Sequence, residues 1–423
     1  MLVEEVAEAA EVKGSKDIEK AVANLTSLHQ PAERYYRDLQ TIKSLHFINY
    51  EIVVALSFHS NPNLDWCSLE NAQLVSSIIQ ANDLRPYLSE YVNQEFKPNL
   101  RKIENQVKSG LGRSGLRPRL IFQDQKFDPV PLAQAWFLIE VTKNKKNVRG
   151  EKKDDKDHND DGDDAEINLL VLLLLIDCFQ FDIQGKIQAC KVLAQLKILT
   201  PKLVPQLREC LAKCLVHIPP VTPEESESLP LLTVALPNLY RVDDEFGTNL
   251  NYIDTIATIL SSLTYVTNYP KTMIFLLQQL SVCINRIGID VLISVSKIFY
   301  ILNQIITNYA MLDKPEVVQT ALKVENDILQ VQSPLVYTFV FDLISAYAVL
   351  EKRIGNHKIE QVNEQKEKVN HKIEQVNEQK EKVNEQIEKV KEQIEINLTS
   401  LKGLAKVCDK VSEFEDLCTY IPS

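Results

Sequence analysis

The motif Gly110-Leu-Gly-Arg-Ser-Gly115 has the G-x-G-x-x-G spacing that lets a backbone approach the pyrophosphate of a dinucleotide. That chemistry needs a buried strand before the glycines and a helix after them. Residues 99–109 instead have the polar pattern of a helix, and Arg117-Pro118-Arg119 does not begin one. We therefore expect a surface loop over Ser109–Leu116 and no cofactor site.

A second candidate for chemistry is the acidic stretch Asp157–Asn168. Its positions 1, 3, 5 and 6 match the start of an EF-hand calcium loop. Position 12 is Asn168, where a bidentate glutamate is required, and no helix is predicted before the loop. We interpret the stretch as part of an acidic linker and expect no metal site.

The nucleophilic and basic side chains form no recognisable catalytic pattern. The eight cysteines include no C-x-x-C pair, and the seven histidines are dispersed. No H-E-x-x-H, Walker A or G-x-S-x-G motif occurs. We expect buried, reduced thiols and no catalytic residues, so the chain is predicted to bind other proteins and not to be an enzyme.

Composition narrows the fold class and the kinds of partner. The chain has 423 residues, a formal net charge of −11 and only 11 glycines. Few glycines disfavour turn-rich β folds, and the acidic balance disfavours direct nucleic-acid binding. One basic cluster is a local exception to the acidic balance: Lys97, Arg101, Lys102, Lys108, Arg113, Arg117 and Arg119. It could bind an acidic partner or nucleic acid, or it could simply be a solvated helix face and loop.

Sequence signals for cellular location are few. The acidic N-terminus lacks the basic start and apolar stretch of a signal peptide. The longest apolar run, Ile167 to Ile176, is too short to span a bilayer. Lys143 to Lys153 is basic enough for a nuclear-import signal. We expect no membrane contact and a location in the cytoplasm and nucleus.

Apolar side chains that recur every three to four residues predict helices along most of the chain, including one over Ala32–Phe58. Between Ile167 and Leu350, breaks leave two helices about every 35–45 residues, the period of HEAT repeats. The predicted fold class is all-α, a HEAT-like α-solenoid. The expected parts are a charged lead-in (1–30), an N-terminal helical half (31–142), a disordered charged linker (143–166), the HEAT-like array (167–350), a long heptad-patterned helix (351–402) and a C-terminal helical segment (403–423).

A 14-residue sequence is repeated verbatim near the C-terminus, where His357–Asn370 is followed by the identical His371–Asn384. Fourteen residues are two heptads, so the apolar stripe from Ile359 to Ile394 stays in phase across the copies. The stripe is thin, which favours a lone helix or a weak antiparallel pairing over a homotypic coiled coil. The in-phase duplication also predicts that the length of this segment can vary.

The segment Leu215–Leu232 has the most distinctive sequence, Leu-Val-His-Ile-Pro-Pro-Val-Thr-Pro-Glu-Glu-Ser-Glu-Ser-Leu-Pro-Leu-Leu. Two prolines should end one helix, a threonine should cap the next, and a proline with two glutamates should form its first turn. In order, these residues are Pro219, Pro220, Thr222, Pro223, Glu224 and Glu225. The block could serve as an interface or simply set the angle between two helices.

This block resembles the signature of the second Tel-interacting protein family, with an additional Ser-Glu before Leu229. Leu116–Phe122 and Leu172–Leu196 are also similar to family sequence, although Asp177 stands alone where the family has two adjacent acids and the usual proline pair before it is missing. The resemblance covers residues 115–350 in patches. The 14-residue duplication lies outside it.

The resemblance implies an α-solenoid subunit of the TTT co-chaperone complex, which in fungi also belongs to the ASTRA complex. Such a subunit binds the larger Tel-type and first Tel-interacting solenoid subunits. With the ninety-kilodalton heat-shock chaperone, the complex matures PI3-kinase-related kinases of the TOR, ATM and ATR types. The implied roles are DNA-damage signalling, telomere maintenance and growth control.

Nine residues are our candidates for partner contact: Pro219, Pro220, Thr222, Pro223, Glu224, Glu225, Leu229, Arg117 and Arg119. An alternative function is a transport or tethering adaptor whose groove takes peptides. Such solenoid adaptors repeat Trp-x-x-x-Asn arrays, whereas this chain has only Trp66 and Trp136.

Overall fold

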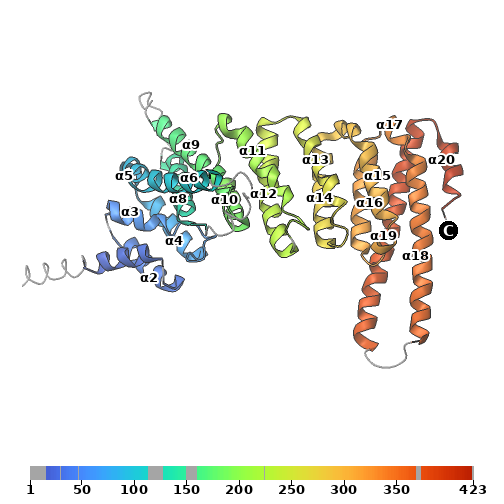
Figure 1. The fold of residues 1–423 in the computed structure, drawn as a ribbon, viewed down its shortest axis with the longest axis horizontal. Helices are drawn as coiled ribbons and strands as arrows, with labels where there is room; N and C mark the ends of the chain where they lie inside the picture. Colours follow the sequence, from blue (N-terminus) through green and yellow to red (C-terminus); the bar gives the residue numbers. More distant parts are fainter. Residues whose placement is uncertain are drawn as a thin grey trace, which may run out of the picture. The chain divides into compact units, whose positions relative to one another are not determined.

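A computed structural model of the protein describes residues 16–28, 30–45, 47–112, 127–148, 160–222, 224–367 and 373–421. Every regular element in these ranges is helical (Figure 1), which confirms the predicted all-α class. Contacts divide the chain into two compact units. Unit 1 comprises Met1–Leu211 and Thr233–Val242, and unit 2 comprises Ala212–Leu232 and Asp243–Ser423.

Unit 1 is built around helix α8 (Val130–Val148). All residues from 131 to 139 are buried, which is the pattern of a helix enclosed on every side. Four helices pack directly against it: α3 (Tyr50–Ser57), α4 (Leu69–Ala81), α9 (Asp160–Cys178) and α10 (Ile183–Gln195). Further out, α2 (Ala32–Lys43) contacts α4, while α5 (Arg85–Tyr91) runs through the π-helical turn η1 (Val92–Phe96) into α6 (Lys97–Gly112).

Two helix boundaries in unit 1 correct our predictions. The helix expected over Ala32–Phe58 is divided in two, because the Asn49 side chain accepts a hydrogen bond of 3.0 Å from the Ile52 N–H and begins α3. Helix α6 continues through Gly112, so the first part of the expected glycine loop is helical. Gly110 and Gly112 therefore lie in a helix and do not follow a strand.

The charged linker predicted over 143–166 is also corrected at both ends. Helix α8 continues to Val148 and α9 begins at Asp160, while residues 149–159 lie outside the described ranges. Both helices therefore extend into a stretch that has little apolar character.

The division between the units does not fall in that charged stretch, where we expected two halves to meet. Helix α9 packs against α6 and α8, and α10 packs against α8 and α9. Residues 167–211 therefore belong with the N-terminal helices. The apolar pattern continues without a change from 167 to 350, so it did not show that residues 167–211 pack with the N-terminal helices and that most of the later residues do not.

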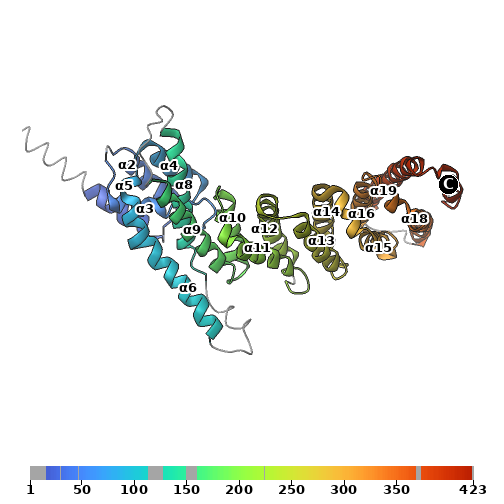
Figure 2. The same ribbon diagram turned by 90° about the horizontal axis from the view of Figure 1, so that it is seen from above.

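Unit 2 contains a regular two-layer array of helix pairs. The pairs are α13 (Asn249–Leu263) with α14 (Pro270–Ile287), α15 (Val295–Ile306) with α16 (Pro315–Leu329), and α18 (Val340–Glu367) with α19 (Ile373–Val407). Helices α13, α15 and α18 form one layer and α14, α16 and α19 the other (Figure 2). The first helices of successive pairs begin about 45 residues apart, as in HEAT repeats. The structure confirms the predicted solenoid-like array.

Residues Pro270–Ile293 are long and apolar enough to cross a membrane, unlike any stretch that we recognised in the sequence. In the array, one face of α14 is buried, with Met273, Leu276 and Leu280 fully enclosed. Arg286, on the outer face, forms an ion pair with Asp244 (Nη1 to Oδ2, 3.0 Å). We interpret the segment as a core helix of the array, because α13 and α16 both cover it.

The long helix predicted over 351–402 is instead a helical hairpin. Helix α18 ends at Glu367 and α19 begins at Ile373, so the chain reverses between the two copies of the 14-residue repeat. We call the two protruding helical segments, residues 357–367 and 373–383, the arm (Figure 1). The prediction was wrong because no glycine or proline marks the reversal and the heptad phase runs through it.

The base of the hairpin is anchored in the array. Ile387, Val390 and Ile394, which belong to the predicted apolar stripe, are each only 2% exposed. Helix α19 packs against α16 and α18 over this stretch. The C-terminal segment then continues with the end of α19 and with α20 (Val411–Cys418).

Candidate functional site

In the described part of the chain, no three His, Cys, Asp or Glu side chains lie close enough together to hold a metal ion. The eight cysteines, all of which are described, form no disulfide bond, and five of them are buried. Burial raises the pKa of the Cys67 thiol to about 12, which disfavours the nucleophilic thiolate. The five buried thiols therefore contribute to the packed core.

The predicted block, Pro219–Leu229, follows η3 (Cys214–Val216), which extends α11 (Val204–Lys213), and continues into the first turns of α12 (Glu225–Phe246). Burial varies along the block: Pro219 is buried, Pro220 is exposed and Leu229 is half-buried. The Pro219–Pro220 peptide bond is cis. Of the other candidates, Pro223, Arg117 and Arg119 lie outside the described residues.

Thr222 does not cap α12, contrary to our prediction. The N-cap residue is Glu224, and its side chain accepts no capping hydrogen bond. Thr222 lies two residues earlier, is 4% exposed, and donates its backbone N–H to the Ile218 oxygen (3.0 Å). Thr222 therefore belongs to the turn that precedes the helix. Glu225 does lie in the first turn of α12, at its positive end, as predicted.

Glu225 also stabilises a neighbouring helix. Its Oε1 atom accepts hydrogen bonds from the Thr272 backbone N–H (2.8 Å) and hydroxyl (2.9 Å). Thr272 is the third residue of α14, where the backbone N–H has no partner within its own helix. The block therefore fastens the start of α12 to the start of α14, which supports its interpretation as a structural joint.

The described members of the basic cluster lie on α6 and are partly neutralised. Lys97 Nζ pairs with Glu166 Oε1 at 2.8 Å, and Lys108 pairs with Glu104. Burial, with a smaller contribution from Glu104, raises the pKa of nearby Asp177 to about 6. Two of the four described basic side chains of the cluster are therefore ion-paired, which weakens the case for this helix as a binding face.

Both tryptophans serve packing in unit 1. The Trp66 Nε1–H donates a hydrogen bond of 2.8 Å to the Phe58 oxygen, and the ring packs on a cluster that includes Leu64 and Ala133. Trp136 is 8% exposed on the central helix α8. Neither residue contributes to an exposed ladder of the kind that a peptide-binding adaptor needs.

Comparison with known protein families matches residues 158–312 to the sequence model of the Tti2 family. This region is similar to the Tti2 family. It runs from the start of α9 past the end of α15 and contains the whole of Pro219–Leu229, so the resemblance to the second Tel-interacting protein family is confirmed there. The Tti2 family suggests a co-chaperone role in the TTT complex. Comparisons with curated proteins and with solved structures give no match.

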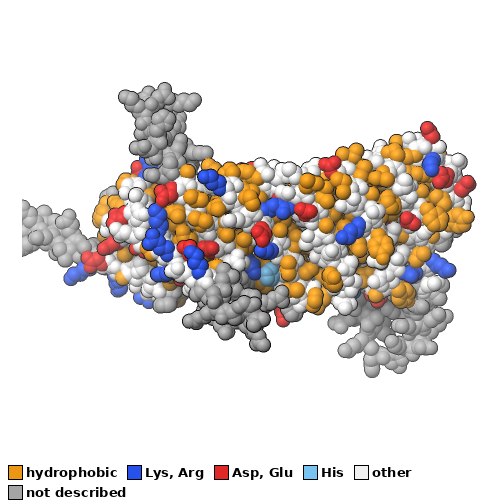
Figure 3. Space-filling model, turned by 45° about the horizontal axis from the view of Figure 1, so that its top comes forward, with side chains coloured by type: hydrophobic (Ala, Val, Ile, Leu, Met, Phe, Trp, Pro, Cys, Tyr) orange, Lys and Arg blue, Asp and Glu red, His pale blue; other side chains and the backbone are white. Residues whose placement is uncertain are grey.

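The sequence did not reveal an exposed apolar surface that begins in the Tti2 region. It lies where η4 (Gly288–Ile293) and α17 (Pro334–Tyr337) connect the helix pairs of unit 2. Six large apolar side chains there are between 47% and 68% exposed, and we call them the apolar edge: Leu250, Ile289, Ile293, Leu335, Phe341 and Val407. Figure 3 turns this side forward and shows hydrophobic side chains gathered over unit 2, at the right. Large exposed apolar side chains that gather on one side of a protein are typical of protein-binding surfaces.

One end of the apolar edge is hollowed. A groove of about 620 Å³ lies between α17, the start of α18, the end of α19 and α20, with Phe341 and Val407 in its walls. The Tyr337 hydroxyl donates to the Lys410 backbone oxygen (3.3 Å), and Lys410 Nζ lies 5.2 Å from the centre of the tyrosine ring. These contacts hold the start of α20 beside α17. The groove is lined by apolar side chains together with Asp409, Lys410 and Glu413, and Lys410 pairs with Glu413 at 3.2 Å.

Proposed function

We propose that this chain is a non-enzymatic scaffold subunit of the TTT co-chaperone complex. The Tti2-family match over residues 158–312 carries the proposal. The two-layer helical array supports it, since stacked helix pairs present extended surfaces on which solenoid proteins hold their partners.

The proposed direct partners are the larger Tel-type and first Tel-interacting subunits. Through them the chain would act with the ninety-kilodalton heat-shock chaperone on PI3-kinase-related kinases of the TOR, ATM and ATR types. Stabilising these kinases would support DNA-damage signalling, telomere maintenance and growth control. We place this activity in the cytoplasm and nucleus and, in fungal relatives, also in the ASTRA complex.

We further propose that the apolar edge contacts a larger helical-repeat subunit. Helical-repeat proteins expose the ends and outer faces of amphipathic helices, whose apolar side chains suit a row of isoleucine, leucine and phenylalanine. Ile289 and Ile293 are 67% and 68% exposed, so little folding energy depends on them. The Pro219–Leu229 joint can then position the array without itself touching the partner.

The test is reconstitution from purified components. The full chain is mixed with recombinant first Tel-interacting and Tel-type subunits, and complex formation is followed by size-exclusion chromatography and titration calorimetry. We expect a stable complex whose affinity falls by at least about tenfold when Ile289→Asp and Ile293→Asp are combined. Tyr265→Asp is the matched control, because Tyr265 is 70% exposed in the α13–α14 connection at the opposite end of the pairs.

The outcomes separate the two parts of the proposal. If the unmodified chain forms no complex with these subunits, the TTT function is wrong. If the complex forms and the double variant binds as tightly as the Tyr265→Asp control, the function stands and the apolar edge is not the contact surface.

A further inference from the structure

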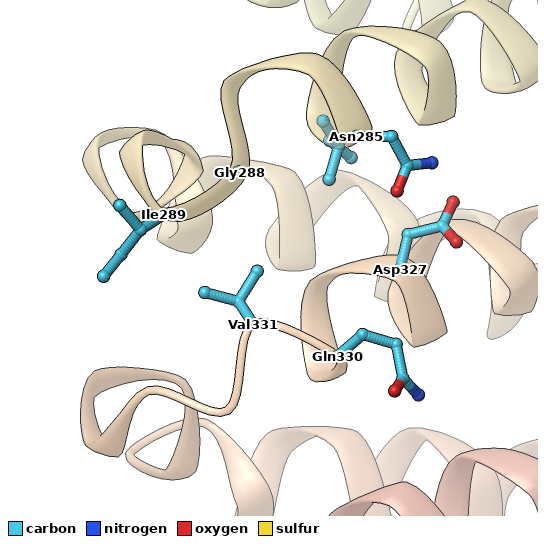
Figure 4. A pocket seen from close by; sticks show the side chains of 7 residues that line it. Asn285, Gly288, Ile289, Asp327, Gln330 and Val331 are labelled. Atoms are coloured by element: carbon cyan, nitrogen blue, oxygen red, sulfur yellow. The ribbon is translucent and has the colours of Figure 1, made fainter.

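A notch opens in unit 2 beside the apolar edge, between the end of α14, η4 and the end of α16 (Figure 4). Its volume is about 300 Å³, which is at the lower end of the range for small binding pockets. Ile289 and Val331 form an apolar rim, while Asn285, Asp327 and Gln330 supply polar groups. Ile289 is shared with the apolar edge, so a partner lying on that edge reaches the notch.

Asp327 is the charged group of the notch. Its carboxylate accepts a hydrogen bond from the Ser281 hydroxyl, and Figure 4 shows it facing the Asn285 amide. Burial raises its pKa, while hydrogen bonds from Ser281 and Asn285 lower it. No cationic side chain is among the groups that act on it in the described part of the chain. The fold therefore brings a half-buried carboxylate to the notch and supplies no ion-pair partner there.

The two amides are presented as acceptors. Asn285 Nδ2 donates to Ser281 Oγ (3.4 Å), and Gln330 Nε2 donates to Asn326 Oδ1 (3.3 Å) and Ser400 Oγ (3.2 Å). Because the NH₂ groups are engaged within the fold, the amide oxygens are left to accept. Asn285 lies in the last turn of α14 and Gln330 directly follows α16, about one repeat of 45 residues later in the sequence.

A ligand that satisfies this set must carry positive charge and several donors on an apolar stem. A guanidinium has five N–H donors in a planar fork, whereas a lysine ammonium is a compact, strongly hydrated point charge. Acceptors spread over two helices suit the fork, and an aliphatic stem can pack along the Ile289 and Val331 rim.

We propose that this notch binds an arginine side chain of the protein partner, with its guanidinium on Asp327 and the Asn285 and Gln330 oxygens. The role of the arginine in a partner rests on the proposed function. The chemistry of the notch is a property of this chain and can be tested without any partner.

The test uses N-acetyl-arginine methylamide as the probe and the full-length chain with its asparagine and glutamine side chains labelled with ¹⁵N. We expect saturable shifts of the Asn285 and Gln330 amide signals. The neutral isostere N-acetyl-citrulline methylamide should give no saturable shift, and the lysine analogue a weaker response. Asp327→Asn keeps the shape and the acceptor for Ser281, and it should reduce the arginine response at least about fivefold.

Asp254→Asn is the matched control, since Asp254 is exposed on α13, away from the notch. Equal responses to arginine and citrulline, or an unchanged response in Asp327→Asn, would overturn the proposal. Circular dichroism verifies that each variant is folded, and Gln330→Leu provides a second variant if Asp327→Asn is not. Loss of the arginine site would not change which subunits the reconstituted TTT complex contains. The arginine site and the TTT function can therefore be refuted independently of each other.

Discussion

The Tyr347 hydroxyl on α18 donates a hydrogen bond of 2.9 Å to the Glu325 carboxyl on α16, and both side chains are fully buried. Asn397 on α19 donates to the same hydroxyl (3.2 Å) and to the Leu322 backbone oxygen (2.9 Å). Three helices from two successive pairs are therefore joined at the base of the arm by one buried polar network. Such networks favour a single arrangement of the helices, because a shifted register would leave buried polar groups without partners.

The Glu325 carboxyl makes the stability of unit 2 depend on pH. Burial raises its pKa to about 8 from an ordinary value of 4.5, so the folded state holds a proton that the unfolded state has released. The free energy of unfolding of unit 2 should therefore fall as the pH rises from about 5 to above 8. Glu325→Gln should flatten this dependence and raise stability at pH 8 by a few kcal/mol, as an order of magnitude.

Amide hydrogen exchange of α16, α18 and α19 between pH 5 and 8, corrected for the intrinsic rates, measures this effect. Glu392→Gln, at an exposed position of α19, is the control and should keep the pH dependence of the unmodified chain. A Glu325→Gln protein with the same pH dependence as that control would contradict the prediction.

His59 gives unit 1 the opposite response to pH. Burial lowers its pKa to about 4 from 6.5, although a contact of 2.8 Å between Nε2 and the Leu25 oxygen partly opposes the shift. The unfolded chain therefore binds a proton that the folded unit excludes, and stability is lost as the pH falls from 6.5 towards 4. Urea unfolding at pH 7 and pH 5, followed by tryptophan fluorescence, reports on unit 1 because Trp66 and Trp136 both lie there. His59→Gln should lessen the loss at pH 5, and an unchanged difference between the two pH values would refute this assignment.

The Glu225–Thr272 contact predicts a stability effect at the Pro219–Leu229 joint. Glu225→Ala removes the acceptor for the first turn of α14 and should lower the free energy of unfolding of unit 2 by about 1–2 kcal/mol. Glu224→Ala is the matched control, because the adjacent carboxylate is exposed and makes no capping bond. Chemical denaturation followed by circular dichroism distinguishes them. Equal destabilisation by both variants would mean that the cap does not stabilise the joint.

The sequence predicted the helices and their period well, because proline and glycine mark real helix ends. Pro270, Pro315 and Pro334 each begin a helix, and Gly288 ends α14 with a positive φ of 55°. The reversal between α18 and α19 was missed because only tertiary packing shows where a continuous heptad pattern folds back. Glu225 was recognised as a first-turn residue, whereas its partner Thr272 is 47 residues away and no local pattern connects them.

The apolar edge and the arginine notch could not be predicted for a related reason. Phe341 and Leu250 fit helical apolar patterns that normally indicate a buried face. Only the stacking of the two layers decides that these side chains remain outside while Leu343 and Ile256 are enclosed. Asp327 and Asn285 likewise come together only through the packing of α14 against α16.

The repeated sequence predicts that the arm can be shortened without unfolding unit 2. Deleting His371–Asn384 leaves the same residues next to the base on both legs, because the copies are identical. Each leg should lose about seven residues, or about 10 Å, with unchanged hydrogen exchange at Ile387 and Val390. Small-angle scattering measures the shortening. Ile387→Ala is the contrasting variant: it removes a buried contact at the base and should lower the free energy of unfolding by about 2–5 kcal/mol. A comparable loss of stability in the deletion variant would contradict the prediction.

The position of the chain reversal determines how the duplicated sequence affects the length of the arm. With one copy on each side of the turn, every copy gained or lost is divided between the two legs of the arm. The tip then advances or retreats by about 10 Å per copy, while the buried residues at the base stay where they are. Reach is thereby separated from folding: relatives of this protein could differ in how far the arm extends through a change in copy number alone, with no compensating substitution in the array.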